Sequence, residues 1–265
     1  MYDFAYHRPK TLAEATAALK GKSEARPVSG GMTLIPTLKQ RLAKPSDLVD
    51  LNGIKDLAGI KVEGNTVTIG GMTRHADVAS SAEVKKAIPA LADLAGQIGD
   101  PAVRNRGTMG GSVANADPAA DYPAAVVALD ATITTTSGQH KGNDFFKGLF
   151  ETALQDGELI TSISYPKPEK AAYQKFRNPA SRYAMVGVFV AKTANGVRVA
   201  VTGAGPSVFR VKAMEEALAK NFSSDAIKDI KIPADGLNSD IHGSAEYRAH
   251  LVNVMARRAV DQANK

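Results

Sequence analysis

The spacing of apolar and polar residues near the N-terminus predicts two helices separated by a short strand. Residues 11–14, Thr-Leu-Ala-Glu, form a capping-box pattern that predicts a helix to about Lys20. Leucines recur every four positions over residues 34–42, which predicts a second helix ending before Pro45. The sequence ARPV leads into a Gly-Gly pair before that second helix, so we expect strand, glycine turn and helix in succession.

The middle of the chain changes its pattern several times. Alternating residues over 60–71 predict a β-hairpin that turns at Gly64 and Asn65. A helical pattern follows, and Pro89 is expected to kink or break it. Residues 100–121 are rich in Gly, Asn, Asp and Pro, and we expect a long irregular segment there, which compact domains keep mainly for function.

The pattern changes again after residues 166–170, Pro-Lys-Pro-Glu-Lys, which are typical of a linker. Residues 171–177 and 183–205 predict antiparallel strands with a tight turn at Asn195-Gly196. Helical patterns then continue to the end, the longest of them beginning at Ser244.

Two Gly-Gly pairs, at Gly30–Gly31 and Gly110–Gly111, are the candidate binding elements. Bare glycine backbone lets N–H groups converge on an anion, and two such loops together would suit a pyrophosphate. Arg104 and Arg106 precede the second pair and would either reinforce it or stay in solvent. A plain tight turn also explains a Gly-Gly pair, so both interpretations stay open here. No Gly-Lys-Ser/Thr and no complete G-x-G-x-x-G is present, which argues against a P-loop or Rossmann site.

Composition narrows the chemistry further. The chain of 265 residues has no cysteine, which excludes disulfides, cysteine nucleophiles, zinc-thiolate sites and iron–sulfur clusters ligated by this chain. The net charge is +6, but the basic residues are scattered, so we expect an ordinary basic surface and no nucleic-acid partner. We expect no secretory signal and no membrane span, hence a cytoplasmic protein. Redox chemistry would need an organic cofactor or another chain.

Four stretches carry a resemblance to a known family: residues 6–19, 25–51, 104–124 and 246–260. The second and third hold the two Gly-Gly pairs, and together the four span nearly the whole chain. They resemble the medium, FAD-binding subunits of the molybdenum hydroxylase (xanthine dehydrogenase) family, those of aerobic carbon monoxide dehydrogenases in particular.

The resemblance implies an α+β fold with FAD held between two α/β subdomains of the PCMH, or vanillyl-alcohol-oxidase, type. It also implies a C-terminal domain with a three-stranded antiparallel sheet and helices. We expect the boundaries at residues 1–52 and 53–168 for the two subdomains and 169–265 for the C-terminal domain.

The resemblance also assigns cofactor contacts to individual residues. In the first loop they are Ser29, Gly30, Gly31, Met32, Thr33 and Leu34; in the second they are Thr108, Met109, Gly110, Gly111 and Ser112; beyond the loops they are Asn115, Asp121, Ile160, Lys175 and Tyr183. The family has Ala, Ser and Asn where this chain has Ser29, Thr33 and Ser112, so each position still carries a small or hydrogen-bonding side chain. Arg182 replaces the acid that often precedes the flavin-side aromatic.

Three of these expectations concern the role of a single side chain. Asp121 is expected to position the flavin rather than to hold the fold, and Asp117 to cap the helix that follows it. Tyr183 is expected beside the flavin ring, with ordinary core packing as the alternative.

The resemblance implies a flavoprotein subunit with FAD as cofactor, no metal site and no acid–base catalytic residues of its own. Electrons would come from a small [2Fe-2S] subunit and leave for a quinone or another acceptor, while a large molybdenum-cofactor subunit oxidises the substrate. The complex would be a dimer of heterotrimers. Two other functions stay open from the residues alone: a non-catalytic nucleotide-binding or regulatory module, and a nucleic-acid-binding protein suggested only by the positive charge.

Overall fold

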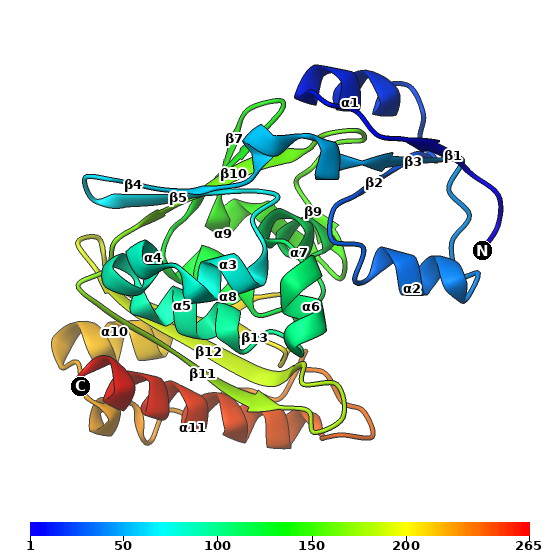
Figure 1. Cartoon of the computed structure of the whole chain (residues 1–265). Helices are drawn as coiled ribbons and strands as arrows, with labels where there is room; N and C mark the ends of the chain where they lie inside the picture. The colour runs from blue at the N-terminus through cyan, green and yellow to red at the C-terminus, as the bar shows by residue number, and fades with distance from the viewer.

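Three main β-sheets follow one another along the chain in the computed structural model, which describes residues 1–265 (Figure 1). The first sheet is parallel, with strand order β1-β3-β2. Its elements are β1 (Ala5–His7), α1 (Leu12–Leu19), β2 (Arg26–Val28), α2 (Leu34–Lys39) and β3 (Asp47–Asp50). Two 3-10 turns, Leu51–Gly53 and Lys55–Leu57, lead out of it.

The capping box predicted for the first helix is confirmed. Thr11 Oγ1 accepts from the Glu14 amide at 3.2 Å, and the Glu14 carboxylate accepts from the Lys10 amide at 2.8 Å. The second helix is shorter than predicted, because Arg41 adopts a left-handed conformation (φ 59°) that ends it. Leu42 therefore lies outside the helix with 73% of its surface exposed.

The second sheet is antiparallel, with strand order β4-β5-β10-β6-β7. Its strands are β4 (Ile60–Glu63), β5 (Thr66–Gly70), β6 (Thr132–Thr135), β7 (Gln139–Lys141) and β10 (Ile160–Pro166). The predicted hairpin is confirmed by the pairing of β4 with β5. Seven helices and one small hairpin lie between these strands: α3 (His75–Ser80), α4 (Ala82–Ala87), α5 (Pro89–Gly96), α6 (Pro101–Arg106), α7 (Met109–Asn115), α8 (Tyr122–Ala128), α9 (Gly142–Phe145), β8 (Phe146–Gly148) and β9 (Glu151–Thr152).

The irregular segment expected over residues 100–121 is wrong, because α6 and α7 occupy most of it. Two polar residues of this segment are helix caps. The Asp100 carboxylate accepts from the Val103 amide at 2.9 Å, and Thr108 Oγ1 accepts from the Gly111 amide at 3.2 Å.

The C-terminal region, from β11 to the end of the chain, holds the third sheet, with strand order β11-β12-β13-β14. Its elements are β11 (Lys170–Arg177), β12 (Ala184–Thr193), β13 (Gly196–Thr202), β14 (Phe209–Arg210), α10 (Lys212–Lys220), a 3-10 turn (Ser224–Ile227) and α11 (Ala245–Ala263). The three strands expected are present with the predicted turn at Asn195-Gly196, and the two-residue β14 adds a fourth.

The C-terminal sheet lies between two layers of helices. Helices α5 and α8 pack on one face, and α10 and α11 cover the other (Figure 1). Tyr173 and Phe189 belong to the same apolar core as the second sheet, while Val188 and Met255 belong to the core under α11. The C-terminal region is therefore joined to the rest through a continuous core. None of the helices is both long enough and apolar enough to span a membrane.

Candidate functional site

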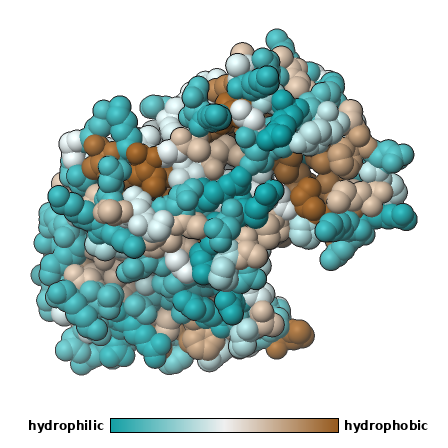
Figure 2. Space-filling model, in the orientation of Figure 1, coloured by the Kyte–Doolittle hydropathy of each residue, from teal (hydrophilic) through white to brown (hydrophobic).

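A cavity of about 620 Å³ lies where all three parts of the chain meet. It is lined by the first loop (residues 29–34) and the second loop (residues 108–112). Residues of the 117–121 loop, of the segment 150–160 and of the segment 181–183 complete its wall. Figure 2 shows the surface hollowed between the N-terminal lobe at upper right and the body below it.

Most of the residues predicted from the sequence line this cavity. They are Ser29, Gly30, Gly31, Met32, Thr33, Leu34, Thr108, Gly110, Gly111, Ser112, Asn115, Asp121, Ile160 and Tyr183. Met109 and Lys175 do not. The Met109 side chain is fully buried in the core, where its sulfur accepts from the Tyr165 hydroxyl at 3.4 Å.

The two glycine loops touch each other at one wall of the cavity. Thr108 Oγ1 lies 3.1 Å from Ser29 Oγ and donates to it. Asn52 donates its side-chain amide to the Ser29 carbonyl at 2.8 Å, and Arg74 donates to the Asn52 side chain and to the Arg106 carbonyl. These bonds hold both loops in one frame.

The glycines are what allow the loops to approach this closely. A Cβ at Gly30 would collide with the Arg106 carbonyl oxygen. A Cβ at Gly111 would lie 2.5 Å from Ser29 Oγ, and one at Gly110 would lie 2.7 Å from the Gly71 carbonyl oxygen. The glycines were expected to make room for a ligand, and the geometry shows that they also make room for the opposite loop.

The first loop presents a row of free backbone donors. The amides of Gly30, Gly31, Met32, Thr33 and Leu34 have no acceptor in the protein. In the second loop the Met109 and Gly110 amides are taken by the carbonyls of Thr73 and Gly71, at 3.0 and 2.8 Å. A row of free amides can form an anion-binding nest, so the first loop is the candidate anion site, while part of the second loop is already bonded within the protein.

The 117–121 loop leads from α7 into α8. The Asp117 carboxylate accepts from the Ala119 amide at 2.9 Å, within the loop itself. The expectation that Asp117 caps the following helix is therefore wrong: α8 has no side-chain cap. Burial raises the pKa of Asp117, while the bond from Ala119 opposes that shift.

Asp121 is buried and held by two side chains of β11. Tyr173 donates its hydroxyl to Asp121 Oδ1 at 2.5 Å, and Lys175 donates its ammonium to Oδ2 at 2.9 Å. Burial raises the pKa of Asp121 and lowers that of Lys175, and their opposite charges counteract both shifts. Removing the carboxylate would leave the Lys175 charge buried and unpaired, so Asp121 also holds the fold, against the expectation from sequence.

Tyr183 stands at the edge of the cavity with 45% of its surface exposed, which excludes ordinary core packing for this ring. Arg182 beside it adopts a left-handed conformation (φ 62°). Ile160, at the start of β10, is buried and contributes an apolar side chain to the wall.

The arginines before the second loop do not line the cavity. Arg104 donates to the carbonyls of Ile98 and Gly99 at 3.0 and 3.1 Å, so it stabilises the turn before α6. Arg106 is exposed.

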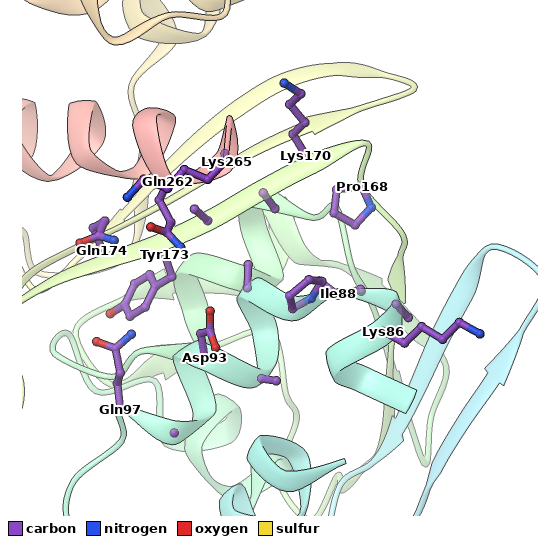
Figure 3. Close-up of a pocket in the computed structure, with 18 of the residues that line it drawn as sticks. Lys86, Ile88, Asp93, Gln97, Pro168, Lys170, Tyr173, Gln174, Gln262 and Lys265 are labelled. Carbon is purple, nitrogen blue, oxygen red and sulfur yellow. The ribbon is translucent and has the colours of Figure 1, made fainter. Parts of the chain in front are cut away.

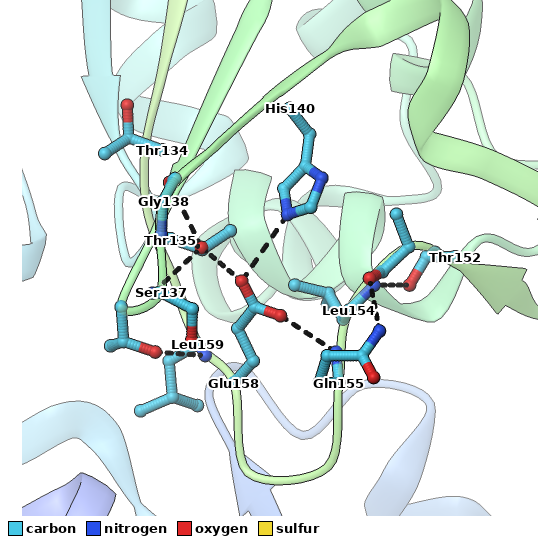
Figure 4. A network of polar contacts seen from close by, with 12 residues as sticks. Thr134, Thr135, Ser137, Gly138, His140, Thr152, Leu154, Gln155, Glu158 and Leu159 are labelled. Carbon is cyan, nitrogen blue, oxygen red and sulfur yellow. Dashed lines mark hydrogen bonds and ion pairs between the residues drawn. The ribbon is translucent and has the colours of Figure 1, made fainter.

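Sequence reasoning missed one wall of the cavity, the segment between β9 and β10. Its shape depends on the buried Glu158 carboxylate, which accepts from Thr135 Oγ1 and from the Gln155 amide, the latter at 2.8 Å (Figure 4). His140 Nε2 lies 3.5 Å from the same carboxylate. Glu158 sits in the sequence QDGELI, where an isolated acid before a strand gives no signal of burial.

A second feature that the sequence did not reveal is His75, at the start of α3. It lines the cavity, is only 4% exposed, and its Nδ1 atom has no hydrogen-bond partner. Its ring packs against Tyr122 with centroids 5.3 Å apart. Burial, followed by the charges of Arg74 and Arg104, lowers the pKa of His75 to about 4, so the imidazole is neutral at pH 7.

Two family models cover almost the whole chain. Residues 2–168 match the FAD binding domain in molybdopterin dehydrogenase, and residues 171–263 match the CO dehydrogenase flavoprotein C-terminal domain. The chain belongs to the FAD-binding family of molybdopterin dehydrogenases. It is a flavoprotein subunit of an oxidoreductase, with FAD as its cofactor.

Relatives of this family are similar over nearly their full length. The glyceraldehyde dehydrogenase medium chain of Sulfolobus acidocaldarius is 37% identical, with 97% of each chain covered. The carbon monoxide dehydrogenase medium chain of Hydrogenophaga pseudoflava is 34% identical, with 98% of this chain and 96% of that one covered.

Solved structures in the family share the fold. The carbon monoxide dehydrogenase of Hydrogenophaga pseudoflava superposes with a TM-score of 0.88 at 35% identity, covering 99% of this chain and 97% of that one. Quinoline 2-oxidoreductase from Pseudomonas putida 86 gives a TM-score of 0.89 at 28% identity, with the same shares covered.

The geometry of this chain fits the family's cofactor. The free amides of the first loop suit the charged oxygens of a pyrophosphate, and the Ser112 hydroxyl adds a further hydrogen-bond donor. The cavity volume is within the range of cofactor sites, and its wall combines apolar side chains with many glycines and polar residues.

Proposed function

We propose that this chain is the electron-transferring flavoprotein subunit of a three-subunit molybdenum hydroxylase. Electrons reach it from a small [2Fe-2S] subunit and leave for a quinone or another acceptor. Bound FAD supplies the redox chemistry. With no cysteine, the chain cannot ligate an iron–sulfur cluster itself, which supports this division of work between subunits.

The row of free amides at residues 30–34 is the observation that carries the proposal. Five neighbouring donors with no acceptor in the protein, in a loop that lines the cavity, suit a polyanionic ligand.

The remaining residues divide by their place around the cavity. Asn115 and Asp121 would hold the ribityl side of FAD, and Tyr183 and Ile160 would contact its ring system. Lys175 affects the cofactor site indirectly, by pairing with the Asp121 carboxylate. Met109 does so by packing in the core against Tyr165, which fixes the position of the second loop.

The partners in this proposal are the small [2Fe-2S] subunit and a large molybdenum-cofactor subunit, joined as a dimer of heterotrimers in the cytoplasm. The relatives' names support a multi-subunit enzyme, since several are medium chains or subunits. The substrate belongs to the molybdenum subunit, in keeping with relatives named for glyceraldehyde, carbon monoxide and nicotine. Residues 1–52, 53–168 and 169–265 are our proposed domains, each containing one main sheet.

Titration of the purified chain with FAD tests the proposal. We expect flavin absorbance to be retained and the bound flavin to be reducible. Tyr183→Leu is expected to change the flavin spectrum because it removes the aromatic ring at the cavity, whereas Tyr247→Leu, an exposed tyrosine on α11, leaves it unchanged. A chain that takes up no FAD, or that binds it in a form that cannot be reduced, contradicts the proposal and favours a regulatory nucleotide-binding module.

A further inference from the structure

The 117–121 loop is held from outside the FAD-binding part of the chain, by the end of β13. Gly203 donates its amide to the Pro118 carbonyl at 2.8 Å. Thr202 Oγ1 lies 3.0 Å from the Pro118 carbonyl oxygen and 2.6 Å from that of Ala120, and donates to them. Thr202 is fully buried and does not line the cavity.

A second contact that fixes the 117–121 loop comes from Tyr173 on β11. The Tyr173 ring forms part of the wall of a separate groove between α5 and β11, where it points from the strand toward the helix (Figure 3). Its hydroxyl reaches past that wall to the Asp121 carboxylate. Gly187 on β12 leaves room for this hydroxyl, since a Cβ there would collide with it.

The parts of the C-terminal region that hold the loop are themselves fixed by α11. Arg248, only 4% exposed, donates to the Met185 carbonyl at 2.7 Å and to the Gly203 carbonyl at 3.2 Å. It also pairs with Asp240 at 2.7 Å. The turn that holds the loop is therefore anchored to the longest helix of the molecule.

We propose that Thr202 and Tyr173 are positioning residues of the FAD site, which hold the 117–121 loop from the C-terminal region. Neither side chain lines the cavity, so each acts through the loop. Thr202 fixes the loop backbone at Pro118 and Ala120, and Tyr173 fixes the direction of the Asp121 carboxylate. This inference rests on the proposed function.

The coupling has to run in both directions, because linkage between two sites is reciprocal. If the hydrogen bonds from the C-terminal region to the 117–121 loop favour FAD binding, bound FAD must stabilise those hydrogen bonds. The Gly203 amide, which donates across to Pro118, reports this directly through its rate of hydrogen exchange.

The test compares Thr202→Val, Thr202→Ser and Tyr173→Phe with the wild type, using the whole chain. Thr202→Val and Tyr173→Phe each remove one hydroxyl at nearly constant shape, and we expect each to weaken FAD binding roughly tenfold. Thr202→Ser keeps the hydroxyl and should bind FAD within about threefold of the wild type. Added FAD should slow exchange of the Gly203 amide in the wild type but much less in Thr202→Val.

Thr193→Val is the matched control. It removes a threonine hydroxyl from the same sheet, one that donates to the Gly196 carbonyl at 3.0 Å in the β12–β13 turn, so FAD affinity should stay near that of the wild type. Loss of FAD affinity in Thr193→Val as large as in Thr202→Val overturns the inference, as do wild-type affinities in both Thr202→Val and Tyr173→Phe. A wild-type chain that binds no FAD instead overturns the proposed function.

Discussion

Gly111 lies where the two loops touch, so even a methyl group there has consequences. In Gly111→Ala the new Cβ would lie 2.5 Å from Ser29 Oγ and 2.8 Å from Thr108 Oγ1, so these side chains must shift and the hydrogen bond that joins the loops is disturbed. We expect FAD affinity to fall at least about tenfold and the apo-protein to lose roughly 1–3 kcal/mol of stability. Flavin titration and urea unfolding measure the two effects.

Gly96→Ala provides the control for that variant. A Cβ at Gly96, in α5, meets only the Ala79 methyl at 3.9 Å, so it should fit without loss. Wild-type flavin binding by Gly111→Ala would show that contact between the loops is unimportant for the cofactor.

His75 makes stability depend on pH. Its pKa is about 4 in the folded chain and about 6.5 when unfolded, so between these values the unfolded state binds more protons. Stability from this residue is therefore present above pH 6.5 and lost as pH falls, by roughly 2 kcal/mol between pH 7 and pH 5. Urea unfolding at both pH values should show a smaller loss for His75→Gln than for the wild type.

The exposed His242 serves as the comparison for that measurement. His242→Gln should reproduce the wild-type pH dependence. Equal pH dependence in His75→Gln and the wild type would mean that His75 is not buried as the structure has it.

Single residues also show where prediction from sequence stops. The loops were predictable because glycine pairs at fixed places in a family pattern carry their own signal. The partner of Asp121 was not, because Lys175 lies 54 residues further along, on β11 of the C-terminal sheet. Side-chain pairing between a loop and a distant strand depends on packing that no local pattern encodes.

At the scale of the elements, one residue at the N-terminus of α7 affects both the stability of that helix and the candidate flavin site. Thr108 caps α7 through the Gly111 amide and also donates to Ser29 of the first loop. We expect Thr108→Val to cost about 1 kcal/mol of stability through the lost cap and to weaken FAD binding as well. Thermal unfolding and flavin titration of the same samples separate the two losses.

Thr11 caps α1 in the same way but does not line the cavity. Thr11→Val should lose similar stability and keep wild-type FAD affinity. If both variants bind FAD equally well, Thr108 acts only as a cap.

Elements with strong local signals were predicted well. The capping box at Thr11 and the break at Pro89 marked true helix ends, and Asn195-Gly196 marked a true hairpin. Helices α6 and α7 were missed because they are only six and seven residues long. Their capping residues, Asp100 and Thr108, are of types that are also common in loops. Strand β14, with two residues, is too short for any alternation to appear.

For the whole molecule, the proposal implies that the chain works only with its partners. The purified chain should bind FAD yet oxidise neither carbon monoxide, purines nor aldehydes. Adding the two partner subunits should restore flavin reduction that depends on substrate, followed by bleaching of the flavin absorbance. Substrate oxidation by this chain alone would instead indicate a self-sufficient flavin oxidase.

For the whole molecule, the resemblance to a family predicted more of the fold and function than hydrophobic periodicity and composition did. The resemblance indicated the fold class and the cofactor, which the family models bear out. The strand orders and the hold of the C-terminal region on the 117–121 loop depend on contacts between distant residues, and periodicity along the chain does not specify them.

The first sheet has its last strand in the middle, and this arrangement sets an order for biosynthesis. Strand β1 pairs only with β3, so residues 5–7 have no strand partner until residues 47–49 have emerged from the ribosome. The second sheet likewise cannot form fully until β10, its central strand, has been synthesised. The bond from the Gly203 amide to the 117–121 loop requires residue 203. A nascent chain thus holds both glycine loops long before it can close the site around them, and the flavin site is completed only late in synthesis.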